Sequence, residues 1–210
     1  SGFDNLYKLA LDRCLAAADY VVAIVPETFL LSSFDKSRLQ LVAVIESDLF
    51  SDTEAPAVVA CFGATAKNCQ VFANDKKIGQ LDQLLSLRKF ANHAKVEIRF
   101  NVAAGRIGLR AVDGSDGETP IAFMPAEKFK YAAGKVSHSS RLMTYVEMPG
   151  LNDAQVAKVI RAANKKLATI RDESKDLVLA PFKGNDKNGK RRRRLDYALA
   201  REILNFAVNQ

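Results

Sequence analysis

A short, continuously apolar run near the start of the sequence limits the fold more than any other segment. Residues 20–25 read Tyr-Val-Val-Ala-Ile-Val, end at Pro26, and follow apolar positions that repeat with helical spacing over residues 6–17. A run without alternation predicts a strand that is buried on both faces of a parallel sheet. We therefore expect an α/β fold that opens with a helix, capped by Asp4 or Asn5, and continues into this strand.

Two further β-rich runs follow this strand closely. Residues 39–45 and 57–62 are joined by a polar loop, with no helix between them. Two such strands are expected to pair antiparallel. One helix cannot cover both faces of a sheet built from these strands. The sequence therefore predicts an incomplete Rossmann-like sheet over residues 1–66, completed by residues absent from this sequence or by another chain.

Beyond residue 67 the pattern changes to short strands and two longer helices, which is typical of a separate α+β domain over residues 67–210. The expected elements are a strand at 71–74, a helix at 81–87, a hairpin of 96–102 with 106–112, strands at 121–124 and 142–147, a helix at 153–170, an extended segment at 177–181 and a final helix after 195.

The last sixty residues carry all of the net charge of +7. Residues 151–210 hold fourteen Lys and Arg against seven Asp and Glu, whereas residues 1–150 hold seventeen of each. Such asymmetry is typical of a chain that binds a polyanion. The alternative is a solvated charge run. The final helix should anchor this basic loop to a folded surface, which favours nucleic acid. The basic residues are Lys183, Lys187, Lys190, Arg191, Arg192, Arg193 and Arg194.

Other function classes have little support in the sequence. No apolar run approaches the roughly 20 residues of a membrane span, so we expect no membrane partner. Cys14, Cys61 and Cys69 are odd in number and lack metal-ligand spacing, which favours free thiols in a reducing cytoplasm. His93 and His138 have no second ligand at metal spacing, so a zinc site is not expected.

Four short motifs follow one another in the first third of the chain, and their order and spacing are informative. They are Asn5-Leu6-Tyr7, the run 20–26, Leu49-Phe50 and the run 57–62. Together they resemble the γ class of N6-adenine DNA methyltransferases over residues 4–66. In that class these pieces are the helix after the catalytic Asn-Pro-Pro-Tyr tetrapeptide, the fifth strand, and the sixth and seventh strands, the seventh being antiparallel.

The resemblance implies a role for Phe50, at the position where the family stacks an aromatic ring on the flipped adenine. Such stacking restores part of the energy lost when a base leaves the duplex. The alternative is an ordinary hydrophobe at the sheet edge. The family's glycine-rich cofactor loop, its acidic ribose ligand and its tetrapeptide are absent from this sequence. S-adenosyl-L-methionine is therefore expected only in the complete enzyme, and this chain alone should be inactive.

In the γ class, the region after the catalytic sheet is the target-recognition domain. Residues 67–210 occupy that place, and the resemblance therefore implies double-stranded DNA as the partner of the basic segment. Most of its cations should neutralise phosphates, while one or two of Arg191–Arg194 read guanine. The chain would then belong to a restriction–modification or phage-borne enzyme. The alternatives are a nucleic-acid-binding protein without an enzyme partner and a structural, phage or ribosome-associated factor.

Overall fold

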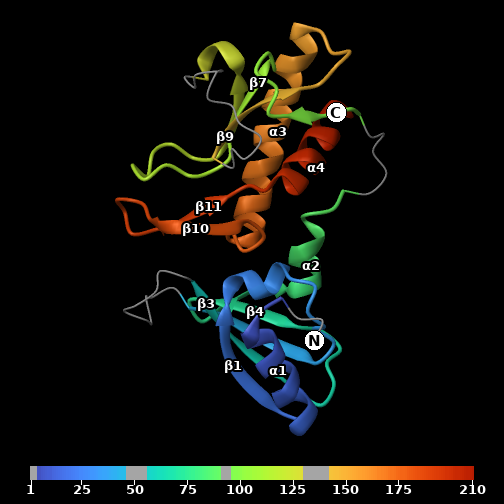
Figure 1. The fold of residues 1–210 in the computed structure, drawn as a ribbon, viewed down its shortest axis with the longest axis vertical. Coiled ribbons are helices and arrows are strands. Elements are labelled where there is room, and N and C mark those ends of the chain that lie inside the picture. The colour runs from blue at the N-terminus through green and yellow to red at the C-terminus, as the bar shows by residue number, and fades with distance from the viewer. Residues whose placement is uncertain (1–3, 46–55, 91–95, 130–141) are drawn as a thin grey trace. The chain divides into compact units, whose positions relative to one another are not determined.

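The computed structural model describes residues 4–45, 56–90, 96–129 and 142–210. The chain divides into two compact units, unit 1 (Ser1–Ser86) and unit 2 (Leu87–Gln210), and both are drawn in Figure 1.

Unit 1 contains one five-stranded sheet with the strand order β1-β3-β2-β4-β5. β3 is antiparallel to both β1 and β2, and β4 is parallel to β2. The antiparallel pairing expected for residues 39–45 and 57–62 is confirmed. The elements are α1 (Leu6–Ala17), β1 (Val21–Pro26), the 3₁₀ helix η1 (Glu27–Leu31), β2 (Leu39–Val44), β3 (Ala57–Phe62), β4 (Gln70–Ala73), β5 (Lys76–Gln80) and α2 (Leu81–Ser86).

The sheet continues past the boundary that the sequence favoured between residues 66 and 67. β4 joins it through β2, and β5 returns beside β4 through a tight turn. The two turn residues, Asn74 and Asp75, have φ values of 48° and 59°, a conformation that Asn and Asp adopt more readily than other side chains. The boundary between the compact units therefore lies after Ser86.

β1 differs from its expected position. Among the residues that the structure describes, it pairs only with β3, antiparallel, and forms an edge of the sheet. Its side chains alternate in exposure, with Val22 and Ile24 at 72% and 53% and Val25 at 4%. The expected strand, buried on both faces of a parallel sheet, is therefore wrong.

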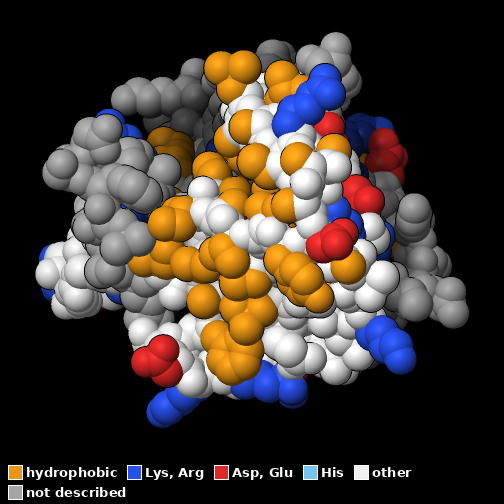
Figure 2. Space-filling view, turned by 90° about the horizontal axis from the view of Figure 1, so that it is seen from below, with side chains coloured by type: hydrophobic (Ala, Val, Ile, Leu, Met, Phe, Trp, Pro, Cys, Tyr) orange, Lys and Arg blue, Asp and Glu red, His pale blue; other side chains and the backbone are white. Residues whose placement is uncertain are grey.

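The two faces of this sheet differ in burial. On one face, Val42, Val58 and Ala60 are fully buried, and the ring of Phe29 in η1 packs on Phe62. The strand register places a second set of apolar side chains on the other face, where they are half-buried or exposed. We call this second face the open sheet face; its residues are Val22, Ile24, Leu41, Ala43, Val59, Cys61 and Phe72. Figure 2 shows hydrophobic side chains gathered across the surface of unit 1.

Unit 2 contains a four-stranded antiparallel sheet with the order β6-β9-β7-β8 and a separate two-stranded sheet of β10 and β11. Two long helices, α3 and α4, lie side by side and α3 packs on β8 (Figure 1). The elements are β6 (Arg99–Phe100), β7 (Ile107–Arg110), β8 (Ala122–Pro125), the 3₁₀ helix η2 (Ala126–Lys128), β9 (Met143–Glu147), α3 (Asp153–Ser174), β10 (Ala180–Asn185), β11 (Arg191–Arg194) and α4 (Tyr197–Val208).

The hairpin expected from residues 96–102 and 106–112 is wrong, because β9 lies between β6 and β7. The connection between these two strands passes directly against β9. A Cβ atom on Gly105 would lie 2.8 Å from the carbonyl carbon of Val146 in β9. Glycine here allows a close backbone approach and does not mark a hairpin turn.

The helix expected at 153–170 is observed and extends to Ser174. Its start is fixed by a capping box, in which Asn152 and Gln155 exchange side-chain to backbone hydrogen bonds of 2.8 and 2.9 Å. The inner side of α3 supplies fully buried Ala163 and Ile170 to the core. α4 begins at the Asp196 cap, where the carboxylate accepts from the Leu199 amide.

Within the described ranges the chain has four α-helices and several sheets. The expected mixed α/β class is therefore confirmed, in a coarser form than the Rossmann-like sheet predicted from the sequence.

Two identical substitutions in β1 test the difference between the sheet faces. Val25→Ala should lower the free energy of unfolding of unit 1 by about 2 kcal/mol, because buried methyl groups are lost. Val22→Ala, on the open sheet face, should change it by less than about 0.5 kcal/mol. Urea titration followed by the amide NMR signals of β3 measures both. Equal losses would contradict the assignment of an open face.

Candidate nucleic-acid interface

The basic segment expected as a loop is a β-hairpin. β10 and β11 pair antiparallel, with Ala180 opposite Arg194 and Asn185 opposite Arg191. The intervening residues form a tight turn in which the Asp186 carboxylate accepts from the amides of Asn188 and Lys190. An Asp that hydrogen-bonds the backbone ahead of it is a strong turn former. The four consecutive arginines therefore form a strand, and the expectation of a loop is corrected.

Backbone contacts fasten β11 to the segment that follows β7. The amide of Asp113 donates to the Arg193 carbonyl (3.1 Å), and the Arg193 amide donates to the Asp113 carboxylate (3.0 Å). One residue earlier, Val112 bridges to Arg194. The hairpin is thereby held on unit 2 through Arg193 and Arg194, the second half of its arginine strand.

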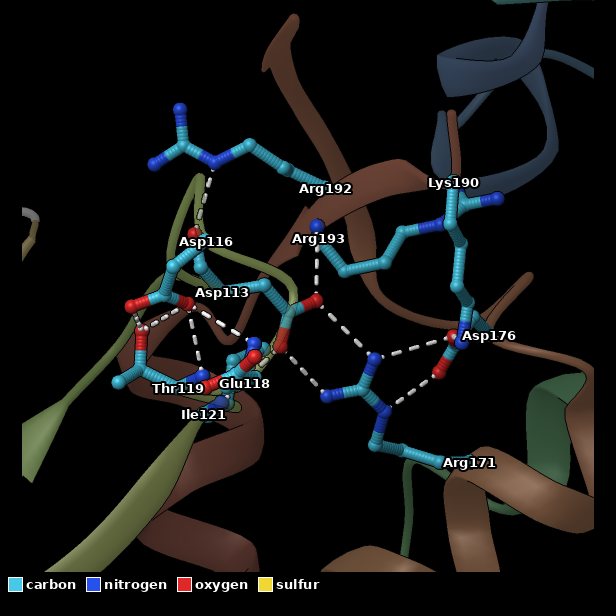
Figure 3. Close-up of polar contacts among 10 residues, drawn as sticks. All are labelled: Asp113, Asp116, Glu118, Thr119, Ile121, Arg171, Asp176, Lys190, Arg192 and Arg193. Atoms are coloured by element: carbon cyan, nitrogen blue, oxygen red, sulfur yellow. Dashed lines mark hydrogen bonds and ion pairs between the residues drawn. The ribbon is translucent and has the colours of Figure 1, made fainter. Parts of the chain in front are cut away.

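The Asp113 carboxylate is in turn held by Arg171 of α3, as Figure 3 shows. The guanidinium donates to both Asp113 oxygens, at 2.7 and 3.0 Å, and to both oxygens of Asp176, at 2.7 and 3.1 Å. The three side chains are 18%, 15% and 8% exposed. We call them the Arg171 cluster.

Burial and hydrogen bonding oppose each other in the Arg171 cluster. Burial would raise the pKa of Asp113, but hydrogen bonds from Arg171 and the Ile121 amide outweigh it and hold that pKa below its usual value. Burial would likewise lower the pKa of Arg171, yet its bonds to the two carboxylates raise it instead. Asp113 and Arg171 are therefore both charged at neutral pH.

A second turn lies beside the tip of the hairpin. Asp116 accepts from the amides of Glu118 and Thr119 and from the Thr119 hydroxyl, and these bonds lower the pKa of Asp116 to about 2. The turn touches the hairpin through the Lys187 amide, which donates to the Ser115 carbonyl (2.9 Å), and through the Lys187–Glu118 ion pair. Glu118 is 74% exposed, so this pair is weak.

The structure separates the seven candidate DNA-binding residues by exposure. Lys183, Lys187 and Lys190 are exposed, whereas Arg191, Arg192 and Arg194 are half-buried. Arg193 is only 7% exposed. Lys190 also forms a 3.2 Å ion pair with the Asp176 carboxylate.

Arg192 holds a fixed position on the hairpin surface. Its guanidinium lies 5.0 Å from the centre of the Phe182 ring on β10, an attractive cation–π arrangement. Its Nε donates to the Asp113 carbonyl at 2.8 Å. The terminal nitrogens extend beyond this contact (Figure 3).

Sequence reasoning did not find the Arg171 cluster. Asp113 falls in a segment expected only as a polar loop, and Arg171 lies 58 residues away. No local spacing connects an ion pair at that separation. The one available signal was an arginine near the buried side of an amphipathic helix, where an unpaired charge is costly.

Other sequence predictions concern residues away from the hairpin. Phe50, the candidate adenine-stacking residue, lies outside the described residues. Among the described residues, no group of three His, Cys, Asp or Glu could hold a metal ion, and no helix is long and apolar enough to cross a membrane. All three cysteines are free; Cys14 is exposed, and burial raises the pKa of Cys69 to about 12.

The chain matches no protein-family model, no curated protein and no solved structure.

Removing the central guanidinium tests the Arg171 cluster. Arg171→Ala should destabilise unit 2 by about 3–5 kcal/mol, because the largely buried Asp113 carboxylate loses its counter-charge and Asp176 keeps only the exposed Lys190. The matched control is Arg99→Ala, whose partner Glu97 is 58% exposed; it should cost about 1 kcal/mol or less. Urea unfolding followed by circular dichroism measures both variants. A loss for Arg171→Ala no larger than for Arg99→Ala would contradict a structural role for the cluster.

Proposed function

We propose that this chain binds double-stranded DNA through the β10–β11 hairpin and serves as the recognition part of an S-adenosyl-L-methionine-dependent adenine-N6 DNA methyltransferase of the cytoplasm. A companion polypeptide, or enzyme sequence outside residues 1–210, supplies the cofactor loop and the catalytic tetrapeptide. No cofactor contact is assigned to this chain, since its sequence contains neither a glycine-rich cofactor loop nor that tetrapeptide.

The observation that carries DNA binding is a basic two-stranded ribbon on the surface of unit 2. A ribbon of this kind fits the major groove of B-DNA. Its exposed lysines, Lys183, Lys187 and Lys190, suit phosphate contacts. Arg191 and Arg192 are the candidates for reading base edges, while buried Arg193 is assigned to holding the hairpin.

The strand arrangement of unit 1 supports the methyltransferase part. β3, which corresponds to the family's antiparallel seventh strand, pairs antiparallel with β1 and β2, the counterparts of the fifth and sixth. The open sheet face and the edge strand β1 together present an apolar surface of the kind that a sheet buries under helices. The companion polypeptide would cover this surface with an apolar helical layer. Phe50 would then face the flipped adenine in the complete enzyme.

Salt dependence tests DNA binding by the hairpin. The double variant Lys183→Ala/Lys187→Ala should bind duplex DNA more weakly and lower the slope of log K against log salt by about 1.8, roughly 0.9 for each phosphate that is no longer neutralised. Fluorescence anisotropy with a labelled duplex at several salt concentrations gives the slope. Arg193 is left unchanged because its burial makes it a structural residue.

The matched control is Lys76→Ala/Lys77→Ala, which removes two exposed charges from β5 in unit 1 and should leave the slope unchanged. Equal slopes for both double variants and the unaltered chain would overturn hairpin binding. Stronger binding to an RNA of the same sequence would instead support a non-enzymatic RNA-binding role.

Capture of the companion tests the methyltransferase part. The protein purified from its own cells should contain an Asn-Pro-Pro-Tyr tetrapeptide, in a companion polypeptide or outside residues 1–210 of the same chain, and should transfer labelled methyl groups to adenine. Ile24→Lys, on the open sheet face, should reduce capture at least about tenfold, because it places a charge in an apolar interface. Leu142→Lys in unit 2, where Leu142 is 49% exposed, is the control and should not.

Duplex DNA binding without any such companion would support the alternative of a nucleic-acid-binding protein with no enzyme partner. It would remove the methyltransferase part of the proposal and leave the DNA-binding part intact.

A further inference from the structure

A cavity of about 460 Å³ lies in unit 2 beside the basic hairpin. It is bounded by the segment after β7, by α3 and by β11. Figure 3 draws some of its lining residues, among them Asp113, Arg171 and Arg192. Small-molecule sites in proteins typically measure about 300–1,000 Å³, so this volume is sufficient for one nucleotide-sized group.

Cations dominate one side of the cavity. Arg171, Lys190, Arg191 and Arg192 line it, against the two carboxylates of Asp113 and Asp186. The Asp113 carboxylate is already engaged by Arg171, and Asp186 by the amides of its own turn. The lining therefore attracts an anion.

The cations are not equally available to a ligand. Arg171 directs its guanidinium at two carboxylates and serves as part of the wall. Arg192 uses Nε on the Asp113 carbonyl and has only a 3.5 Å contact from Nη1 to the Lys183 carbonyl. Its Nη2 makes no hydrogen bond to any part of the chain that the structure describes. Lys190, with a side chain that is 66% exposed, can also turn toward an anion.

Another part of the lining is apolar. Ile121 and Leu167 are buried there, each 3% exposed, and Ala168 is an exposed residue of α3 on the same lining. Asn164 is fixed between them, because its amide group exchanges hydrogen bonds of 2.8 and 2.9 Å with the backbone of Phe123. A flat apolar group could therefore pack on this wall while an attached anion meets the guanidinium groups.

From this juxtaposition we infer that the cavity binds a single nucleotide unit, with its phosphate at Arg192 and Lys190 and its base against Ile121, Leu167 and Ala168. Arginine recognises phosphate through its planar array of donors, and a base loses little when apolar side chains replace the water on its face. The nucleotide could be free or carried in a strand. This inference goes beyond duplex binding and does not depend on it: Lys183 and Lys187, which the hairpin test replaces, do not line the cavity, whereas Lys190 and Arg192 contribute to both surfaces.

Ala168→Glu tests the cavity without disturbing the core, since the residue is exposed on a helix. The new carboxylate would occupy the mouth and compete for the guanidinium groups. The control, Thr169→Glu, introduces the same charge at the next exposed position of α3, which does not line the cavity. Circular dichroism should show both variants folded.

Isothermal titration calorimetry with adenosine 5′-monophosphate, adenosine and inorganic phosphate measures the ligand chemistry. The monophosphate should bind more tightly than either fragment. Ala168→Glu should weaken it at least about tenfold, whereas Thr169→Glu should change it less than about twofold. Inorganic phosphate binding as tightly as the monophosphate would overturn the base-binding wall.

A short single-stranded oligonucleotide distinguishes the two sources. Binding of the free monophosphate assigns the cavity to a free nucleotide. Binding of the oligonucleotide alone, still sensitive to Ala168→Glu, assigns it to a nucleotide carried in a strand. Binding of neither, or equal loss in both variants, would overturn the inference. Lys183→Ala/Lys187→Ala should leave cavity binding unchanged, so the outcome is separable from that of the hairpin test.

Discussion

The Arg171 guanidinium is the interaction on which the arrangement of unit 2 depends. It joins the last turns of α3 to Asp113 and Asp176, and Asp113 in turn holds the backbone of β11. The position of the basic hairpin is thus set by a largely buried charge. The same ion pair forms one wall of the cavity, because α3 and the segment after β7 meet there. Breaking a buried pair of this kind costs far more than its net contribution to stability.

In unit 1 the main constraint on the fold is that the two faces of the sheet differ in burial. One face is sealed by α1 and η1, with Phe29 fully buried, while the open sheet face keeps Val22 and Ile24 exposed. An antiparallel sheet can expose one face to water when that face is polar. Here the exposed side chains are aliphatic, which is the arrangement expected of a binding surface. The two units thus offer different chemistry, an apolar face in one and a basic ribbon in the other.

The sequence was sufficient where structure is determined locally. The pairing of β2 with β3 followed from their short connection, and α3 begins at Asp153 as its apolar spacing indicated. Prediction failed where distant residues decide. An apolar run such as residues 20–25 does not distinguish a strand buried on both faces from an edge strand with one face open. Residues 191–194 were not predicted as a strand, because four consecutive arginines show no alternation of apolar and polar residues that would indicate their pairing with residues 180–185. The cavity, likewise, is assembled from three segments that are remote in sequence.

Arg38 has a consequence for the order in which unit 1 assembles. Its guanidinium donates to the carbonyls of Leu15, Ala18 and Asp19 at the end of α1, and to that of Gly63 just after β3. α1 has twelve residues and no side-chain cap at its start, and a helix of that length is marginal by itself in water. Its final carbonyls gain their partner only once the chain has emerged beyond Arg38. During synthesis, α1 is therefore expected to become stable well after its own residues have left the ribosome.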